Sequence, residues 1–237
     1  MRLEGKGQSS RARLTEDLGF GAYKGSWEHV MKQSATAIGL MFCLSACGGG
    51  GGGSGGGVGG GGGIDPRLAR LDIYEAQKLR VLGDPGAGVM GMPMTSLGNV
   101  PDSGALTFEG SASIRIERED APLVLFGDAG IRLDFDTSNA VGQIDRVFGT
   151  NSTGTVVDFS GVIDMAGGVP GQNMDLSYQG TLNASGETLG FDGTMNGVLL
   201  GNPVGAFSAA DLEASVDQNG TTQTATMVIT LEQVNKP

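Results

Sequence analysis

Histidine, tryptophan and cysteine are almost absent from this chain, which holds one histidine, one tryptophan and two cysteines in 237 residues. The histidine is His29 and the tryptophan is Trp27, and the cysteines are Cys43 and Cys47. If the segment before Cys47 is removed during maturation, no histidine and no free thiol remain. Ser-His-Asp and Cys-His catalysis and the common zinc sites are then excluded.

Aromatic residues are also scarce, at 5% of the chain. After Cys47 the only tyrosines are Tyr74 and Tyr178. Paired carboxylates can hydrolyse glycosides, but sugar sites normally also need exposed aromatic rings on which a sugar stacks. We therefore expect no enzyme, no cofactor and no bound metal.

The N-terminal region has an apolar run, 35–46, that follows Lys32 and has the length of a signal-peptide core. It is too short for a transmembrane helix, which needs about 20 apolar residues. It ends in Leu-Ser-Ala-Cys, which looks like a bacterial lipobox and predicts cleavage before Cys47 and lipid attachment to its thiol. A chance match within a buried segment is the alternative. Cys43 would leave with the signal, so no disulfide is expected.

These features divide the N-terminal part into three segments. Residues 1–30 mix charges of both signs and fit no signal peptide, so we interpret them as an upstream extension, with Met31 as the true start. Residues 31–46 are the predicted signal peptide. Residues 47–63 hold the lipidated Cys47 and a tether, because fourteen of the sixteen residues after it are glycine and cannot bury apolar surface. Glycine, not aspartate, follows Cys47, which favours sorting to the outer membrane.

Charge limits the partners of the mature chain. Removing the four acidic and six basic residues that precede Cys47 leaves 22 acidic against 9 basic residues, a net charge of −13. Such a chain repels phosphate backbones, so we expect no nucleic-acid partner and no adhesion to anionic lipid. Membrane attachment would come from acyl chains on Cys47.

A short helix is predicted at 64–83. Asp65 is a good N-cap, Pro66 suits the first turn and Gly83 suits a C-terminal cap. The side chains that recur at helical spacing predict one amphipathic face; they are Leu68, Leu71, Glu75, Leu79 and Leu82. Residues 84–101 are rich in glycine and proline and predict an irregular connection.

From residue 102 to 237 the hydrophobic period changes to two. Apolar and small side chains alternate with polar ones over 106–116, which is typical of a strand with one buried face. The pattern recurs at 131–136, 157–163, 176–182, 189–195, 210–216 and 225–231, with weaker runs at Leu123–Phe126 and Val141–Val147. Eight strands, or nine, with short connections and no intervening helix predict an all-β fold. We expect an antiparallel barrel, because closure removes exposed edges.

An aromatic residue followed two positions later by glycine occurs four times in this region, in the triplets that begin at Phe108, Phe159, Tyr178 and Phe191. Such a glycine lets a strand bend sharply or lets a ring lie over bare backbone. Core packing explains this quasi-repeat better than a cofactor site does.

Two further motifs are discounted. Residues 86–91 satisfy G-x-G-x-x-G but neither follow a strand nor open a helix, so dinucleotide binding is not indicated. Asp134, Asp136, Ser138 and Asp145 resemble the oxygen spacing of a calcium loop, but Asn139 replaces its glycine, so we expect a hairpin turn. Phe148 is the one candidate for an exposed aromatic anchor, and a core position is the alternative for it.

Four stretches carry a resemblance to a known family. They are VPDSGALTFEG at 100–110, GDAGIRLDF at 127–135, VDFSG at 157–161 and LGFDG at 189–193. These resemble the C-terminal eight-stranded barrel of transferrin-binding protein B-like surface lipoproteins, a group related to factor H binding protein. The resemblance implies a barrel over about 100–235 and a surface location. Transferrin-binding protein B has two lobes, each with a handle domain, whereas this chain has room for one barrel, so no transferrin-contacting residue is carried over.

Two hypotheses of function follow. The first is an outer-membrane, surface-exposed lipoprotein, anchored through Cys47, whose small barrel binds a protein or solute as the resemblance implies. The alternative is a structural or accessory envelope lipoprotein with no small-molecule ligand. Both need the same anchor and the same barrel, so the sequence does not separate them.

Overall fold

The computed structural model describes residues 65–150, 155–169, 171–184 and 186–234. By its contacts the chain divides into two units, Met1–Gly53 and Ser54–Pro237, and the described residues all belong to the second. The extension 1–30, the signal segment 31–46 and the lipobox and tether 47–63 lie outside the described residues, so these interpretations stay predictions. Within the described part, no helix is both long and apolar enough to span a membrane.

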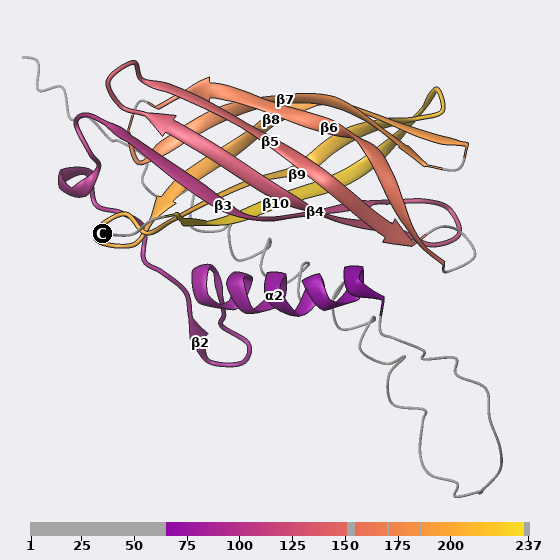
Figure 1. Cartoon of the computed structure of the whole chain (residues 1–237), viewed down its shortest axis with the longest axis horizontal. Helices are drawn as coiled ribbons and strands as arrows, with labels where there is room; N and C mark the ends of the chain where they lie inside the picture. Colours follow the sequence, from indigo (N-terminus) through magenta and orange to yellow (C-terminus); the bar gives the residue numbers. More distant parts are fainter. Residues whose placement is uncertain (1–64, 151–154, 170, 185, 235–237) are drawn as a thin grey trace, which may run out of the picture. The chain divides into compact units, whose positions relative to one another are not determined.

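Eight antiparallel strands close into a barrel in the order β10-β3-β4-β5-β6-β7-β8-β9 (Figure 1). Their bounds are β3 Ala105–Ile116, β4 Leu123–Asp134, β5 Asn139–Thr150, β6 Val156–Gly168, β7 Asn173–Ala184, β8 Glu187–Leu200, β9 Ala206–Gln218 and β10 Thr221–Gln233. The predicted all-β antiparallel barrel is confirmed, with eight strands and not nine in the barrel.

The ninth predicted strand arose from dividing β4 in two. The runs 123–126 and 131–136 belong to one continuous strand, Leu123–Asp134, which pairs with β3 along its whole length. The two runs are separated by Gly127-Asp128-Ala129-Gly130, which has no large apolar side chain, so the hydrophobic alternation is interrupted there although the strand continues. Backbone pairing with β3 continues through these residues regardless of their side chains.

Apolar side chains fill the interior of the barrel. They form one buried cluster to which every strand contributes, and its largest fully buried members include Tyr178, Phe108, Phe207, Ile114 and Leu125. Eight strands give a barrel just wide enough for side chains to fill its centre. The inside of this barrel therefore supplies stability, and its outer surface is available for contacts.

The aromatic–glycine triplets perform both predicted tasks. At Gly193 a Cβ atom would lie 2.4 Å from the hydroxyl oxygen of Tyr178, so the tyrosine ring lies over bare backbone. At Gly161, which has φ +123°, a Cβ atom would lie 2.0 Å from the carbonyl oxygen of Thr181. The first glycine makes room for a ring, and the second allows a positive φ in β6 where the backbone of β7 comes close.

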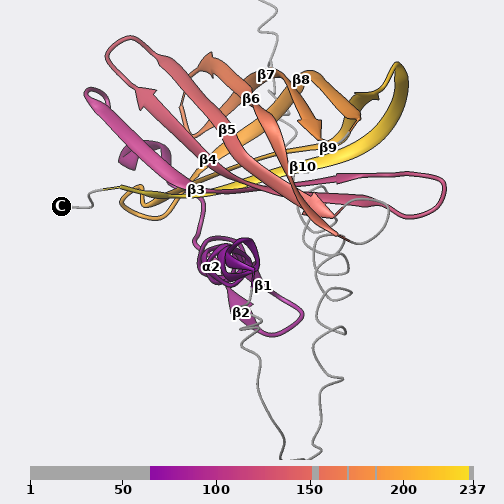
Figure 2. The ribbon, with the colours of Figure 1, turned by 45° about the vertical axis from the view of Figure 1, so that its right-hand side comes forward.

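One helix, α2 Pro66–Val81, lies on the outside of the barrel, as Figures 1 and 2 show from two directions. Asp65 caps it by accepting a hydrogen bond from the Arg67 backbone N–H at 2.9 Å, and Gly83, with φ +73°, follows its end. Along the chain, α2 is followed by the paired short strands β1 Gly83–Asp84 and β2 Val89–Met90 and by the 3-10 helix η2 Leu97–Asn99, and then by the first strand of the barrel.

The side of the helix that packs differs in part from the predicted amphipathic face. The buried residues of α2 are Tyr74, Gln77 and Val81, whereas Leu68 of the predicted face is exposed and Leu79 is half-buried. Amphipathic periodicity assumes an apolar docking surface. Where α2 docks, the outer face of the barrel presents carboxylates and backbone carbonyls as well as apolar rings, so hydrogen-bonding side chains also determine which side of the helix packs.

Candidate functional site

Helix α2 crosses the outer surface of the barrel and contacts five neighbouring strands in turn. Near its N-terminus, Arg67 forms an ion pair with Asp158 on β6 at 3.2 Å. One turn later, Arg70 reaches Asp128 on β4 at 2.9 Å and donates to the backbone carbonyl of Arg146 on β5 at 3.2 Å.

The second half of the helix reaches the remaining two strands. Gln77 Nε2 donates to the backbone carbonyl of Glu109 on β3 at 3.0 Å. Arg80 forms a two-pronged ion pair with Glu232 on β10, at 3.0 and 2.6 Å. The helix is therefore held across β6, β5, β4, β3 and β10 mainly by polar contacts.

Asp128 is the centre of the densest of these contacts. Its carboxylate accepts a short hydrogen bond from the Tyr74 hydroxyl. It also forms ion pairs with Arg70 and with Arg146, the latter at 2.5 Å. Burial, and then the hydrogen bond to Asp128, raise the pKa of Tyr74. Burial alone would lower the pKa of Arg70, but its hydrogen bonds with Asp128 and Tyr74 raise it. Both groups therefore keep their protons at neutral pH.

Phe148, the candidate for an exposed anchor, is buried instead. Its ring lies 6.0 Å from that of Phe126, and the Arg70 guanidinium lies 4.9 Å from its centroid. It belongs to the outer face of β5, where it pairs with Phe126 of β4, and it is absent from the interior cluster. Phe148 is therefore buried, as the alternative required, but beneath α2 and not in the interior cluster.

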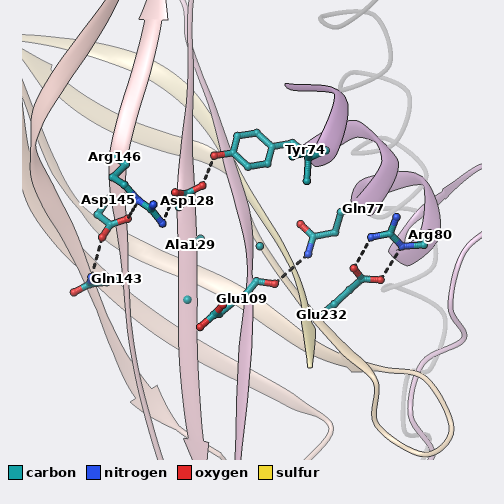
Figure 3. Close-up of a pocket in the computed structure, with 13 residues that line it drawn as sticks. Tyr74, Gln77, Arg80, Glu109, Asp128, Ala129, Gln143, Asp145, Arg146 and Glu232 are labelled. Atoms are coloured by element: carbon teal, nitrogen blue, oxygen red, sulfur yellow. Dashed lines mark hydrogen bonds and ion pairs between the residues drawn. The ribbon is translucent and has the colours of Figure 1, made fainter. Parts of the chain in front are cut away.

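A groove of about 450 Å³ opens beside α2, and we call it the α2 groove (Figure 3). One wall is the helix, and the other wall and the floor are strands β3, β4 and β5, with β10 at one end. Its lining residues are Ile73, Tyr74, Gln77, Arg80, Glu109, Gly110, Asp128, Ala129, Gly130, Gln143, Asp145, Arg146 and Glu232.

Gly110 makes the close approach of the helix possible. A Cβ atom at this position would lie 2.5 Å from Gln77 Oε1 and 2.3 Å from the backbone carbonyl oxygen of Thr230. Both distances are shorter than real Cβ contacts allow. Any other residue at 110 would push Gln77 away from β3, so the glycine of the Phe108 triplet determines where α2 lies.

The far wall of the groove contains a bulge in β5. The register against β4 shifts between Phe126 and Asp128, which pair with Phe148 and Asp145, so β5 has one more residue than β4 at this point. The extra stretch contains Arg146, which has a left-handed φ of +47°. A bulge redirects the side chains at its extra residue. Here it places Asp145 and Arg146 beside Asp128, with Arg146 Nε 3.6 Å from Asp145 Oδ1 (Figure 3).

The other residues singled out in the sequence lie away from this groove or are unsuited to stacking. Tyr178 is inside the barrel, where it donates to Asp211 Oδ2 at 2.8 Å, and Tyr74 is covered by its own helix. Neither tyrosine presents a ring to solvent. The calcium-like spacing includes the predicted hairpin turn, in which Thr137 N donates to Asp134 Oδ1 at 3.0 Å. Residues 86–91 contain the end of the β1–β2 turn, strand β2 and Gly91.

Sequence reasoning missed the groove entirely. Glu109, Asp128 and Gln143 occupy ordinary outward positions in alternating strands, and nothing in the pattern says that they face a helix. One signal was present: Ile144 and Val147 are both apolar with two polar residues between them, which breaks the period of two. That break marks the bulge that brings Asp145 and Arg146 to the groove.

Comparison with known proteins gives fold-level similarity alone. No family model matches the chain, and no curated protein sequence is significantly similar to it. Among solved structures, it is similar to two variants of transferrin binding protein B from Haemophilus parasuis, with 13% and 15% identity and a TM-score of 0.43 for each. It is also similar to the N-lobe domain of lactoferrin binding protein B from Moraxella bovis, with 13% identity and a TM-score of 0.33.

These matches cover 60%, 60% and 61% of this chain. The chain spans 28% and 29% of the two transferrin binding protein B structures and 62% of the lactoferrin binding protein B lobe. The resemblance drawn from the sequence motifs is confirmed in the fold, since the structure is the eight-stranded barrel that it implied. No binding residue is carried over from these proteins.

Proposed function

We propose that this chain is a lipid-anchored binding module of the outer membrane, which presents its barrel at the cell surface and takes a protein or solute on the outside of that barrel. The observation that carries the proposal is the contrast between the apolar cluster that fills the interior and the polar α2 groove outside it. A filled eight-stranded barrel offers its outer surface, not its centre, to a ligand.

Anchoring rests on the sequence. The lipobox ending at Cys47, the glycine-rich tether after it and the family resemblance all support a lipoprotein held away from the bilayer. By the scaling of glycine-rich chains, a sixteen-residue linker of this composition would have an end-to-end distance of about 20–25 Å, which would let the barrel reorient. The proposal includes binding and no catalytic step.

Protease treatment of intact cells tests the location. A surface-exposed barrel is cut away from its anchor, whereas a barrel inside the envelope is protected until the outer membrane is opened. Cys47→Ser is the matched variant: it cannot be lipidated, so the chain should leave the membrane fraction. Cys43→Ser is the control and should leave anchoring unchanged.

Affinity capture on the purified full chain tests the binding, with spent medium and envelope extract as separate sources. Recovery of an external molecule supports a binding module. Recovery of envelope-assembly components alone would support the structural or accessory role instead, and would replace the proposal.

A further inference from the structure

Two pairs of like charges face each other across neighbouring strands of the α2 groove. Glu109 on β3 is directly opposite Glu232 on β10, and Asp128 on β4 is directly opposite Asp145 on β5. Residues in such positions have Cβ atoms about 4.5–5.5 Å apart, and like charges there are destabilising. Without positive charges nearby, these pairs would lower the stability of the barrel at this site.

The arginines around the groove offset three of these four carboxylates. Arg80 pairs with Glu232, and Arg146 contacts Asp128 at 2.5 Å and Asp145 at 3.6 Å. The exposed Glu109 carboxylate forms no hydrogen bond or ion pair with any residue in the described part of the chain. Unneutralised negative charge is therefore left over β3.

A buried amide adds an unused acceptor. Gln77 is 7% exposed, and its Nε2 is occupied by the backbone carbonyl of Glu109. Its Oε1 accepts no hydrogen bond from the residues that the structure describes, although the side chain reaches from α2 into the groove (Figure 3). Within the described part of the chain this oxygen is not a fully buried atom, so it can accept a hydrogen bond from water or from a donor group placed in the groove.

The floor between these acceptors is bare. Gly130 lies between Glu109 and Gln143 in one lateral row across β3, β4 and β5. The nearest atom to a Cβ there would be the Phe108 carbonyl oxygen, at an ordinary 3.6 Å, so a side chain would fit. Because Gly130 has no side chain, the space above the floor of the groove is open to a group from a ligand.

We propose that the α2 groove binds the cationic side chain, lysine or arginine, of a partner protein. The ammonium or guanidinium group would lie over Gly130, within reach of the Glu109 carboxylate and of Gln77 Oε1. Lysine carries three donors and arginine five, and neither has an acceptor, which matches a site made of unused acceptors. This inference rests on the proposed binding function and names the chemistry of the ligand.

The test is a titration of the ¹⁵N-labelled full chain, followed by NMR, with three neutral-ended pentapeptides that differ at the central residue. The lysine peptide is expected to shift the amide signals of Gly110 and Gly130. The norleucine peptide, which keeps the alkyl chain and lacks the charge, and the glutamate peptide should leave them in place. Raising the salt concentration should weaken the lysine response.

Variants locate the site. Glu109→Gln should weaken the lysine peptide about tenfold or more, because it removes a charge-assisted hydrogen bond. Glu213→Gln on β9 makes the same change in net charge at an exposed position away from the groove, and should have no effect. Glu109→Gln should also raise the urea midpoint of the free protein, since it relieves the repulsion from Glu232.

Filling the floor gives a second, independent variant. Gly130→Val should fold at least as stably as the parent, because valine favours strands, and should abolish the peptide response. Gly190→Val on β8, where a Cβ would meet no atom nearer than 3.5 Å, is its control and should bind normally.

Several results would overturn the inference. Equal binding of the lysine and norleucine peptides, or equal effects of Glu109→Gln and Glu213→Gln, would remove the role of charge. Calcium ions that shift the same signals when the peptide does not would replace a side chain by a metal ion. A captured partner whose affinity survives Glu109→Gln would leave the binding function standing without this site. If the chain binds the peptide but is protected from protease on intact cells, the α2 groove would remain a binding site and the proposed surface location would fail.

Discussion

The inside of the barrel and the contact between the barrel and α2 are built by opposite chemistry. Inside, apolar side chains from every strand pack into one cluster, and the hydroxyl of Tyr178 donates a hydrogen bond to Asp211. Under α2, the contacts are arginine–carboxylate pairs, a tyrosine hydroxyl and a glutamine amide. The first arrangement is cooperative and insensitive to salt, whereas the second is a set of separate polar contacts. Disruption should therefore unfold the barrel in the first case and loosen the helix in the second.

The largest effect is expected from the interior. Phe108→Ala would remove a fully buried ring that packs 6.2 Å from that of Phe207, and should lower the free energy of unfolding by about 3–5 kcal/mol. Urea denaturation measures it. Leu97→Ala, at a residue that is 72% exposed, should change stability by less than about 0.5 kcal/mol. If the two substitutions lowered the free energy of unfolding by similar amounts, the interior would not contribute more to stability than the outside of the barrel.

Gly110→Ala acts where the two regions meet. The new methyl group would overlap the Thr230 carbonyl oxygen and the Gln77 amide, so the free energy of unfolding should fall by about 1–3 kcal/mol. Hydrogen exchange should report greater loss of protection in α2 than in the barrel. The matched control, Gly130→Ala on the next strand, meets no close atom and should retain parental protection.

Tyr74→Phe tests the polar side of the comparison. Loss of the hydrogen bond to Asp128 should cost about 1–2 kcal/mol at neutral pH. The pKa of Tyr74 is raised in the folded protein, so its contribution is complete below the unfolded pKa of about 10 and is lost as pH rises above that value. Urea midpoints between pH 8 and 11 should therefore fall less steeply in the variant. An unchanged slope would show that Tyr74 is not the group that titrates.

The smallest effect is expected from Arg80→Ala. Its pair with Glu232 is half-exposed on the arginine side, so the stability loss should be about 0.2–1 kcal/mol and should shrink further in high salt. A double-mutant cycle with Glu232→Gln gives the pair energy. A loss as large as that of Phe108→Ala would mean that α2 is part of the cooperative core.

The same contrast explains what could be predicted. Strand positions followed from alternation, because residues such as Ile114, Leu125 and Ile131 must point inward, and closure followed from the strand count. The face of the helix followed only in part, because Leu79 is half-buried but Leu68 is exposed. Polar contacts, such as that of Gln77 with the Glu109 carbonyl, also determine which side of the helix packs. The groove depends on cross-strand register, such as Glu109 opposite Glu232, and on a one-residue bulge. Neither can be read from a single strand.

The order in which α2 meets the strands has a mechanical consequence. The chain enters the helix at Asp65, directly after the glycine-rich segment, so a pull from a membrane anchor would load the N-terminal end first. The Arg67–Asp158 contact would part before the contacts of Arg70, and the Arg80–Glu232 pair would part last. Bonds that break one after another yield at a lower force than bonds that break together. Under force, α2 would thus detach from the barrel one contact at a time, while the strands of the barrel stay paired.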